Sequence, residues 1–415
     1  MKNRLKRDNS RLKGAITLES SKSESNRALI INALAGGNVA DIHNLSNARD
    51  TQTMRSLLQG KPDVYDVKDA GTTMRFLTAY LAIHGQGEII TGTDRMKNRP
   101  IGPLVDALRT IGAKIEYLEK DGYPPLKIHR IENQLTNKIA IPGNISSQYI
   151  SALLMIVPSM EQGLEITLTS EIYSRPYIEM TLSLMKAFGV GNEWTGNSIK
   201  VSRQTYQPVE YTIEGDWSGA SYWYSFISMA PEDSKLQLPT LRKDSTQGDI
   251  AIATIMNDLG VETQFEQNAV YLRKLPLNQK KLTIDFRSCP DLAQTVMVSA
   301  AVIGIELEMT GLESLKIKET DRIAAMQHEL AKIGATLTEN DKMWYLIPSD
   351  HLPDAVTIET YEDHRMAMAF APLCLKMDVT IDDPSVVEKS YPGYWDEIKR
   401  LSIEIQESSN LPLNP

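Results

Sequence analysis

Two kinds of helix alternate along the chain, and they differ in how their apolar positions are arranged. The first kind is apolar on nearly every face, which is typical of a helix surrounded by other elements. Six segments have this character: residues 25–34, 72–83, 147–157, 218–229, 291–303 and 365–375. Their first residues are 47, 75, 71, 73 and 74 positions apart, and the near-constant later intervals indicate an internal repeat.

The second kind of helix has an apolar stripe and a polar face. Such helices begin near Asp50, Arg99, Arg175, Gln247 and Lys318, and each ends at a glycine that suits a left-handed cap. Runs such as LEITLTS and KLTIDF, which are bounded by turn residues, predict strands. We therefore predict about six copies of a unit of strands, one buried helix and one exposed helix, three before and three after residue 215. The alternative is an ordinary α/β protein with accidental spacing.

Length, charge and cysteine content narrow the class of protein. A chain of 415 residues exceeds one ordinary core, so two domains are expected. A net charge of −9 argues against a nucleic-acid partner held by bulk charge, although it permits a local basic pocket. Cys289 and Cys374 imply no disulfide framework. With neither a signal segment nor a membrane-length apolar run, we expect a cytoplasmic protein with no membrane contact.

Polar clusters precede the apolar helices. They are SSKSESNR, DAGTTMR, NISSQY, EGDWSGASY, FRSCPD and YEDHRMAM. Helix starts favour anions, because their backbone N–H groups are free and the helix dipole is positive there. Helix capping alone would explain Ser218 or Asp291. It does not explain Lys22 and Arg27, or Arg365, for which we favour ligand binding.

The exposed helices add a second set of cations at their starts. This set is Arg95, Lys97, Arg99, Arg175, Lys318, Arg322 and, near the C-terminus, Lys389. A cation at a helix start opposes the dipole, so either a bound anion or a salt bridge to an acid has to explain it. In a continuous helix Lys318 and Arg322 would share a face, with Glu319 beside them. Asp291 is the natural second carboxylate for proton transfer.

Other chemistries have little support in the sequence. Neither a nucleotide-binding P-loop nor a G-x-G-x-x-G segment opening a helix is present. The six histidines show no zinc-like spacing, and neither cysteine has the context of a nucleophile. The sequence therefore predicts an enzyme acting on small anions without a metal ion.

The clusters together carry a family resemblance. SKSESNRALI, DAGTTMRF, RMKNRPIGPLVDAL, ISSQYISALLM, SRPYIEMTLSLM, EGDWSGASY, PDLAQT, KETDRIAAM and DHRMAMAF resemble, in order, the motifs of the 3-phosphoshikimate 1-carboxyvinyltransferase (EPSP synthase) family. The resemblance covers the chain from Gly14 to Trp395. The related UDP-N-acetylglucosamine enolpyruvyl transferases share the fold but lack this combination of motifs.

The resemblance implies an α/β (α+β) fold, a two-domain inside-out α/β barrel of six βαβαββ units with the helices buried in each domain. Residues 1–14 plus 217–415 would form a discontinuous domain and residues 15–216 an inserted one. Hinges would fall near residues 14–20 and 214–218, with the active site in the inter-domain cleft. Since the basic clusters repel one another, we expect an open free enzyme that closes on its ligands.

The resemblance also implies a reaction. The 5-hydroxyl of shikimate 3-phosphate attacks C2 of phosphoenolpyruvate while C3 is protonated, and the tetrahedral intermediate then loses phosphate. Both substrates are anionic, so the site has to neutralise several negative charges. No metal and no organic cofactor are implied, and we expect a monomer. The alternatives are a sister enolpyruvyl transferase for another alcohol, such as a UDP-sugar, and a non-catalytic anion-binding paralogue.

The resemblance assigns roles to individual residues. The catalytic set would be Asp291 as proton acceptor, Glu319 as acid–base group and Lys22. Shikimate 3-phosphate would be bound by Lys22, Ser23, Arg27, Ser146, Ser147, Gln148, Ser174, Asp291 and Lys318. Phosphoenolpyruvate would be bound by Lys22, Gly71, Arg99, Gln148, Arg322, Arg365 and Lys389. How Asp291, Glu319 and Lys22 divide the protons stays open.

The first loop reads LESSKS in place of the usual L-P-G-S-K-S, so it lacks the Pro-Gly of the family pattern, and three single positions also depart from that pattern. Asp69 stands for the usual Asn, Phe76 for the usual Pro, and Ser314 for an Asn that often precedes the KETDR lysine by four residues. The first two bear on the loop that carries Gly71, and the third leaves one substrate contact open.

Overall fold

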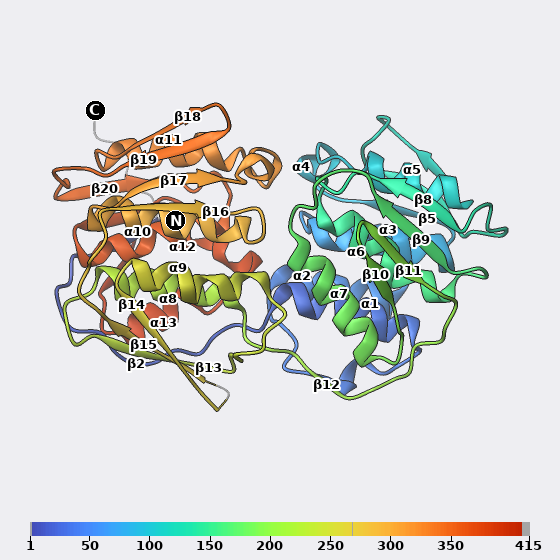
Figure 1. Cartoon of the computed structure of the whole chain (residues 1–415), viewed down its shortest axis with the longest axis horizontal. Helices are drawn as coiled ribbons and strands as arrows, with labels where there is room; N and C mark the ends of the chain where they lie inside the picture. The colour runs from blue at the N-terminus through green and yellow to red at the C-terminus, as the bar shows by residue number, and fades with distance from the viewer. Residues whose placement is uncertain (1, 268, 409–415) are drawn as a thin grey trace. The chain divides into compact units, whose positions relative to one another are not determined.

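The chain folds into two compact units. The computed structural model describes residues 2–267 and 269–408. One unit, here called the inserted unit, is Ser20–Ile213; the other, the split unit, contains the described residues of 2–19 and 214–408 (Figure 1). The chain thus crosses from one unit to the other after Glu19 and again after Ile213.

Each unit is built around three buried helices that pack against one another. In the inserted unit they are α1 (Lys22–Leu34), α3 (Gly71–His84) and α6 (Ser147–Ile156). In the split unit they are α8 (Trp217–Met229), α10 (Ala293–Ile303) and α12 (His364–Phe370). Every residue of α8 and α12 is buried, which is why these helices lack a polar face. The prediction of six buried helices is confirmed.

Three of these helices differ at their ends from the prediction. The 3-10 turns η2 (Val157–Ser159) and η6 (Ala371–Leu375) follow α6 and α12, and each contains a proline, which removes a backbone donor from the helical ladder. A third turn, η4 (Pro290–Leu292), precedes α10. Asp291 therefore lies in a tight turn before its helix.

Six amphipathic helices pack outside the buried ones. They are α2 (Arg49–Gly60), α5 (Gly102–Ile111), α7 (Arg175–Ala187), α9 (Ile252–Asp258), α11 (Arg322–Lys332) and α13 (Tyr394–Arg400), with the short α4 (Asp94–Lys97) before α5. The predicted caps Gly112, Gly189, Gly260 and Gly334 all have positive φ. After α2, however, Lys61 takes the left-handed conformation, with φ 42°, and Gly60 ends the helix.

Five four-stranded sheets share one topology. In the first, β16 (Lys281–Asp285) pairs parallel with β17 (Glu306–Thr310), and the hairpin of β18 (Thr336–Asn340) and β19 (Met343–Ile347) adds antiparallel through β19. In the inserted unit the second sheet has the order β4 (Val64–Asp66), β5 (Gln86–Thr91), β7 (Leu126–His129) and β6 (Lys114–Tyr117), and the third has the order β8 (Lys138–Ile141), β9 (Leu164–Leu168), β11 (Ser198–Val201) and β10 (Glu193–Thr195). In the split unit the fourth sheet has the order β2 (Lys13–Ala15), β13 (Lys235–Pro239), β15 (Ala269–Lys274) and β14 (Val261–Glu266). The fifth has the order β20 (Ala355–Ile358), β21 (Asp378–Ile381), β1 (Lys2–Leu5) and β22 (Ile405–Ser408).

This topology makes the repeat explicit. Each complete copy runs strand, buried helix, strand, exposed helix and hairpin, and the N-terminal β1 completes the copy that begins with β20. The inserted unit interrupts one copy between β2 and α8. The copy around α1 and α2 is shorter than expected, because its sheet is only β3 (Ile42–His43) paired with β12 (Tyr211–Thr212). The two-domain α/β architecture is as predicted.

Candidate active site

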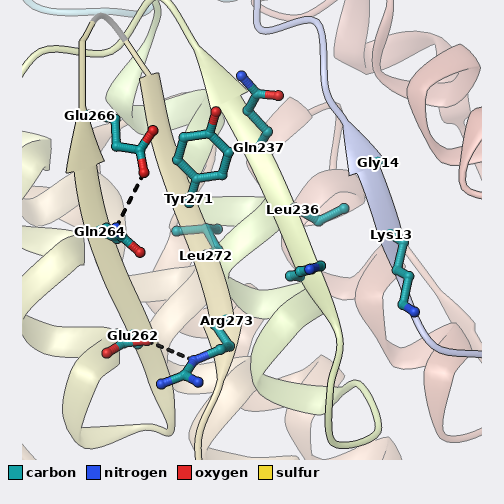
Figure 2. Close-up of a pocket in the computed structure, with 11 residues that line it drawn as sticks. Lys13, Gly14, Leu236, Gln237, Glu262, Gln264, Glu266, Tyr271, Leu272 and Arg273 are labelled. Carbon is teal, nitrogen blue, oxygen red and sulfur yellow. Dashed lines mark hydrogen bonds and ion pairs between the residues drawn. The ribbon is translucent and has the colours of Figure 1, made fainter.

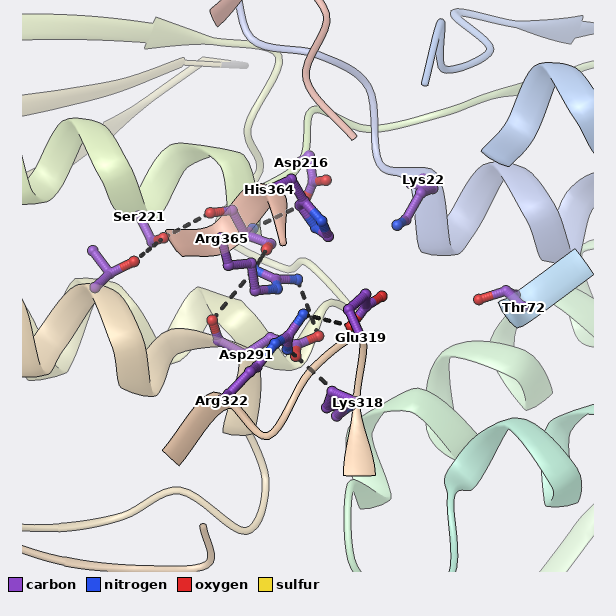
Figure 3. A network of polar contacts seen from close by, with 12 residues as sticks. Lys22, Thr72, Asp216, Ser221, Asp291, Lys318, Glu319, Arg322, His364 and Arg365 are labelled. Carbon is purple, nitrogen blue, oxygen red and sulfur yellow. Dashed lines mark hydrogen bonds and ion pairs between the residues drawn. The ribbon is translucent and has the colours of Figure 1, made fainter. Parts of the chain in front are cut away.

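Arg322 is the centre of a buried ion-pair network in the split unit (Figure 3). It is the first residue of α11 and is 1% exposed. Its Nε donates to Asp363 Oδ2 at 2.7 Å. Its two terminal nitrogens donate to Asp291 Oδ1 at 3.0 Å and to Glu319 Oε2 at 2.7 Å. Burial alone would lower the pKa of Arg322, but the three carboxylates outweigh it and raise that pKa, so the guanidinium stays charged.

Asp291 is surrounded by cations. Besides its bond to Arg322, its Oδ2 lies 3.1 Å from a terminal nitrogen of Arg365, and its Oδ1 lies 3.7 Å from Lys318 Nζ. Burial by itself raises the pKa of Asp291, but the charges of Arg365, Lys318 and Arg322 hold it well below the ordinary value. Asp291 is therefore ionised in the free protein, which is the state a proton acceptor needs.

Arg365 is oriented by hydroxyl groups from another buried helix. One terminal nitrogen donates to the Ser218 hydroxyl at 2.5 Å and to the Tyr222 hydroxyl at 3.3 Å, both on α8. The expectation that Ser218 is a simple helix cap is wrong. Asp216 accepts the Ser218 N–H at 2.8 Å and caps α8, which leaves the Ser218 hydroxyl to accept from Arg365.

The KETDR segment enters the network from a turn and from a helix start. Asp321 accepts the N–H groups of Ile323 and Ala324, each at 3.1 Å, so α11 begins at Arg322. The expectation that Lys318 and Arg322 share one helix face is therefore wrong, because Lys318 lies before the helix, next to η5 (Glu313–Ile317). Lys318 reaches Asp291 from that turn, and burial lowers its pKa.

Glu319 lies between two cations. Its Oε2 accepts from Arg322, and its Oε1 lies 3.6 Å from Nζ of Lys389, a buried residue at the end of η7 (Pro384–Lys389). All the candidate residues from the second half of the chain thus belong to one network. These residues are Asp291, Lys318, Glu319, Arg322, Arg365 and Lys389.

Sequence reasoning missed Asp363. This fully buried carboxylate binds Arg322 and also accepts the Arg365 N–H at 2.9 Å as the cap of α12. An acid before an apolar helix is the ordinary sign of a cap, so the sequence carried a signal for only one of its two tasks. The same carboxylate therefore fixes the start of α12 and one edge of the Arg322 guanidinium.

The inserted unit carries the remaining candidates, most of them at helix starts, with Arg27 in the second turn of α1 and Arg99 between α4 and α5. Lys22 begins α1, and its Nζ lies 3.2 Å from Asp50 Oδ2, whose side chain is 4% exposed. Sequence reasoning did not single out Asp50, because an acid in the first turn of an amphipathic helix is common. The ion pair restricts where the Lys22 ammonium group can lie.

Arg27 is buried, and its hydrogen bonds go to neutral groups. Its guanidinium donates to Thr181 Oγ1 at 2.7 Å, to the Ser23 carbonyl at 2.8 Å and to Ser151 Oγ at 3.3 Å. It lies 5.3 Å from the ring centre of Phe76 and 5.9 Å from that of Tyr177. Within the described residues no carboxylate forms an ion pair with it. Burial lowers the pKa of Arg27 to about 10, so it remains a cation at neutral pH.

Gly71, the first residue of α3, lies against two guanidinium groups. A Cβ at this position would lie 2.6 Å from a terminal nitrogen of Arg75 and 2.6 Å from one of Arg99. Arg75 is held by the carbonyls of Gly71, at 2.9 Å, and Pro100, at 3.1 Å. In the described part of the chain the buried Nε of Arg99 has no hydrogen-bond partner. Arg99 therefore retains donor capacity for an anion.

The start of α6 supplies the amide and hydroxyl candidates. Ser146 caps the helix by accepting from the Gln148 N–H at 3.4 Å, and Gln148 Nε2 donates to Thr72 Oγ1 on α3 at 3.1 Å. Ser147 is buried beside them. Ser174 precedes α7 with a left-handed φ of 54° and makes no capping bond.

The three departures from the family pattern have distinct surroundings. Phe76 is fully buried in α3, where its ring supports Arg27. Asp69 lies before α3 and pairs with Arg49 at 3.1 Å. Ser314 is part of η5, the turn before Lys318. Phe76 thus takes part in the Arg27 environment, which the sequence comparison alone did not suggest.

A separate hollow of about 560 Å³ lies over the sheet formed by β2, β13, β14 and β15 (Figure 2). Lys13, Lys235 and Arg273 lie along one part of it, and Glu262 and Glu266 along the edge strand β14. None of its lining residues belongs to the Arg322 network. Arg273 and Glu262 form an ion pair there, and the lining carries charges of both signs and not a gathering of one sign.

Comparison with known proteins places this geometry in context. The family model described as EPSP synthase (3-phosphoshikimate 1-carboxyvinyltransferase) matches residues 6–60 and 55–398. A 3-phosphoshikimate 1-carboxyvinyltransferase of Bacteroides fragilis is 46% identical over 402 residues, covering 96% of this chain and 97% of that protein. One of Sulfurovum sp. is 36% identical over 421 residues, covering 94% and 97%.

Solved structures agree on the fold. An EPSP synthase from Acinetobacter baumannii superposes with a TM-score of 0.80 at 20% identity, covering 98% of this chain and 100% of that one. Among the residues described here, no helix combines the length and the apolar character that a bilayer crossing demands.

Proposed function

The chain belongs to the EPSP synthase (3-phosphoshikimate 1-carboxyvinyltransferase) family, and from this premise we propose the reaction that it catalyses. It transfers the enolpyruvyl group of phosphoenolpyruvate to the 5-hydroxyl of shikimate 3-phosphate. The products are 5-enolpyruvylshikimate 3-phosphate and phosphate, formed by addition and elimination. The observation that carries the proposal is the network in which Arg322 and Arg365 hold Asp291 beside Glu319.

In the addition step we assign proton acceptance to Asp291 and proton donation to Glu319. The substrate oxygen forms a bond to C2 of phosphoenolpyruvate, its proton passes to Asp291, and C3 receives a proton from Glu319. Asp291 is ionised but weakly basic while three cations face it. When substrate anions engage Arg322 and Arg365, less positive charge acts on Asp291, and its pKa should rise toward the range of a useful base.

In the elimination step the C2–O bond to phosphate breaks, and C3 loses a proton to a carboxylate, for which Glu319 is our candidate. Cations stabilise the charge that gathers on the leaving phosphate. We assign this task to Arg99, Arg322, Arg365 and Lys389, together with Lys22. We assign the binding of shikimate 3-phosphate to Ser23, Arg27, Ser146, Ser147, Gln148 and Ser174 of the inserted unit and to Lys318 of the split unit. We assign Gly71 and Gln148 to phosphoenolpyruvate.

Phosphate release tests the proposed reaction. Purified protein given phosphoenolpyruvate should release phosphate only when shikimate 3-phosphate is also present. Release that does not depend on this acceptor would overturn the proposal. Release that requires a UDP-sugar instead would assign the chain to the sister reaction.

We also propose that the enzyme is a cytoplasmic monomer in which the crossings near residues 14–20 and 214–218 act as hinges. The thiols of Cys289 and Cys374 are free and buried, which suits a reducing compartment. Both substrates together should lower the radius of gyration measured by small-angle X-ray scattering, because they neutralise repelling cations. An unchanged radius would contradict the hinge proposal, and a dimer mass in sedimentation would contradict the monomer.

A further inference from the structure

A strained loop leads into α12, the helix that carries Arg365. This approach loop comprises residues 359–363. Tyr361 and Glu362 both have φ of 53°, a left-handed conformation that residues with a Cβ adopt reluctantly, and here it occurs twice in succession. Asp363, which holds Arg322 and caps α12, follows directly. Any relaxation of the loop would therefore move a ligand of the Arg322 network.

The loop is held by one carboxylate on a neighbouring helix. Glu329 of α11 is fully buried; its Oε1 accepts from the Tyr361 hydroxyl at 2.8 Å, and its Oε2 accepts the Glu359 N–H at 3.2 Å. His328 Nδ1 lies 2.5 Å from the same hydroxyl. Burial, followed by the hydrogen bond to Glu329 and the acids nearby, raises the pKa of Tyr361, so the hydroxyl remains a donor.

The rest of the loop is fixed by backbone hydrogen bonds. The Thr360 N–H donates to Asp382 Oδ1 at 2.9 Å, and the Asp363 N–H donates to the Thr360 carbonyl at 2.8 Å. Glu329 follows Arg322 by seven residues on α11, which is about 10 Å along a helix. One helix thus holds the segment at two points, at Asp363 through Arg322 and at Tyr361 through Glu329.

The same cluster could be taken for a metal site. Ligand atoms of His328, Glu329 and Glu359 lie within 4.8 Å of one another. However, Lys332 Nζ lies 2.8 Å from Glu329 Oε2 and 3.4 Å from Glu359 Oε1. An ammonium group already supplies the positive charge there, and a divalent ion would have to displace it. The contacts favour a role in holding the loop.

We propose that Glu329 and Tyr361 are positioning residues that hold the approach loop in place. The loop in turn fixes Asp363, which orients Arg322 and the start of α12 with Arg365, and these two arginines bind phosphoenolpyruvate. The inference rests on the proposed function for its substrate, but the anchoring itself does not. Neither residue touches the reacting atoms in this account. Both act through Asp363, which connects the loop to Arg322 and to the first turn of α12.

Kinetics of conservative variants test the positioning. Tyr361→Phe removes one oxygen, and Glu329→Gln keeps the shape but removes the charge. Each should raise the KM for phosphoenolpyruvate about five- to tenfold and change the KM for shikimate 3-phosphate less than twofold. The double variant should lose less than the product of the two single effects, because both changes act on the Tyr361–Glu329 contact. Tyr345→Phe on β19, the matched control, should behave as the parent.

Two kinetic results would overturn the proposal. One is an unchanged KM for phosphoenolpyruvate in the folded Tyr361→Phe protein. The other is a double variant in which the two effects multiply in full, since two residues that share a contact should show coupling. A lower melting temperature with parental KM values would likewise show that the contact only stabilises the fold.

Hydrogen exchange tests the anchoring independently of catalysis. In Tyr361→Phe the amides of Glu359, Thr360 and Asp363 should exchange at least tenfold faster than in the parent, while amides of the β16–β17 pair should not change. Equal exchange in the loop would overturn the anchoring. A parent protein without acceptor-dependent phosphate release would overturn the proposed function alone, and the exchange result would still decide the loop.

Discussion

Arg322 and Arg27 are both buried arginines assigned to anion binding, but their surroundings are opposite. Arg322 donates to three carboxylates, whereas Arg27 donates to two hydroxyls and a carbonyl and lies over two aromatic rings. Burial has to be compensated in both cases. In the split unit acidic side chains compensate the charge of Arg322. Around Arg27 neutral dipoles and ring faces do so by direct contact, and the Glu24 carboxylate adds a more distant attraction.

The difference predicts how each site receives a ligand. An anion that approaches Arg27 competes with hydrogen-bond acceptors that are neutral, so no ion pair among the described residues has to be displaced. An anion that approaches Arg322 or Arg365 competes with the carboxyl groups that already bond to them, Asp291 on both arginines and Glu319 on Arg322. We therefore expect the inserted-unit residues to bind an anion more readily, and the split-unit residues to respond to binding by changing the charge around their two acids.

The largest expected effect comes from Glu319, one of the acids that distinguish the two surroundings. Glu319→Gln should lower turnover by about 10²–10⁴-fold, the usual range for a lost acid–base group. Calorimetry should show that both substrates still bind, since Arg322 and Lys389 keep their charges. Glu339→Gln, which alters only an exposed ion pair with Lys316, is the control. Parental turnover in Glu319→Gln would remove this residue from the mechanism.

Measurements of unfolding free energy test directly whether Arg322 and Arg27 are compensated differently. Arg322→Met leaves three carboxylates without their shared cation and should cost about 3–5 kcal/mol of unfolding free energy. Arg27→Met removes hydrogen bonds to neutral acceptors and a weaker attraction to Glu24, and should cost about 1–3 kcal/mol. Urea unfolding, followed for each unit, would measure both. Equal losses would mean that the two arginines are compensated alike.

A smaller effect on catalysis is expected at Gly71, whose backbone lies against the guanidinium groups of Arg75 and Arg99 in the inserted unit. The Cβ in Gly71→Ala would meet Arg75 and Arg99 at 2.6 Å, so at least one guanidinium has to move. The KM for phosphoenolpyruvate should rise about tenfold, in keeping with the sensitivity of catalysis to small misplacements. Gly60→Ala adds the same methyl group where nothing lies within 4 Å and is the control. An unchanged KM would show that Arg99 can move without loss.

The smallest effect concerns acid stability. The pKa of Asp291 is lower in the folded protein than in the unfolded chain, so its stabilising contribution is present above the ordinary carboxyl pKa of about 4. That contribution is lost as the pH falls below this value toward the folded pKa. Unfolding free energies from pH 7 to 3 should therefore decline less steeply in Asp291→Asn than in the parent. Parallel curves would contradict the charge assignment.

Much of the fold followed from local patterns. Apolar residues on all faces of 218–229 and 365–375 predicted buried helices, and α8 and α12 are indeed fully buried. Glycines after amphipathic stripes predicted left-handed caps, as Gly112 and Gly334 show. These signals act within a few residues, so a sequence can display them without its neighbours in space.

Much of the candidate site did not follow from such patterns. Asp50, Asp363 and Tyr222 contact Lys22, Arg322 and Arg365 across 28, 41 and 143 positions of sequence. Each partner looks like a cap or a core residue in its own segment. The start of α11 was misplaced for a related reason, because Asp321 both belongs to the motif and caps the helix.

The amino-acid sequence by itself determined the repeat, the buried helices and the polar residues at their starts, because helix periodicity and capping are local properties. Only the tertiary structure decided which charges are paired. Arg322 and Arg27 look alike as basic residues at helix starts, yet one meets three acids and the other two rings. Burial makes that distinction matter, since a charge out of water interacts strongly with whatever group the fold places beside it.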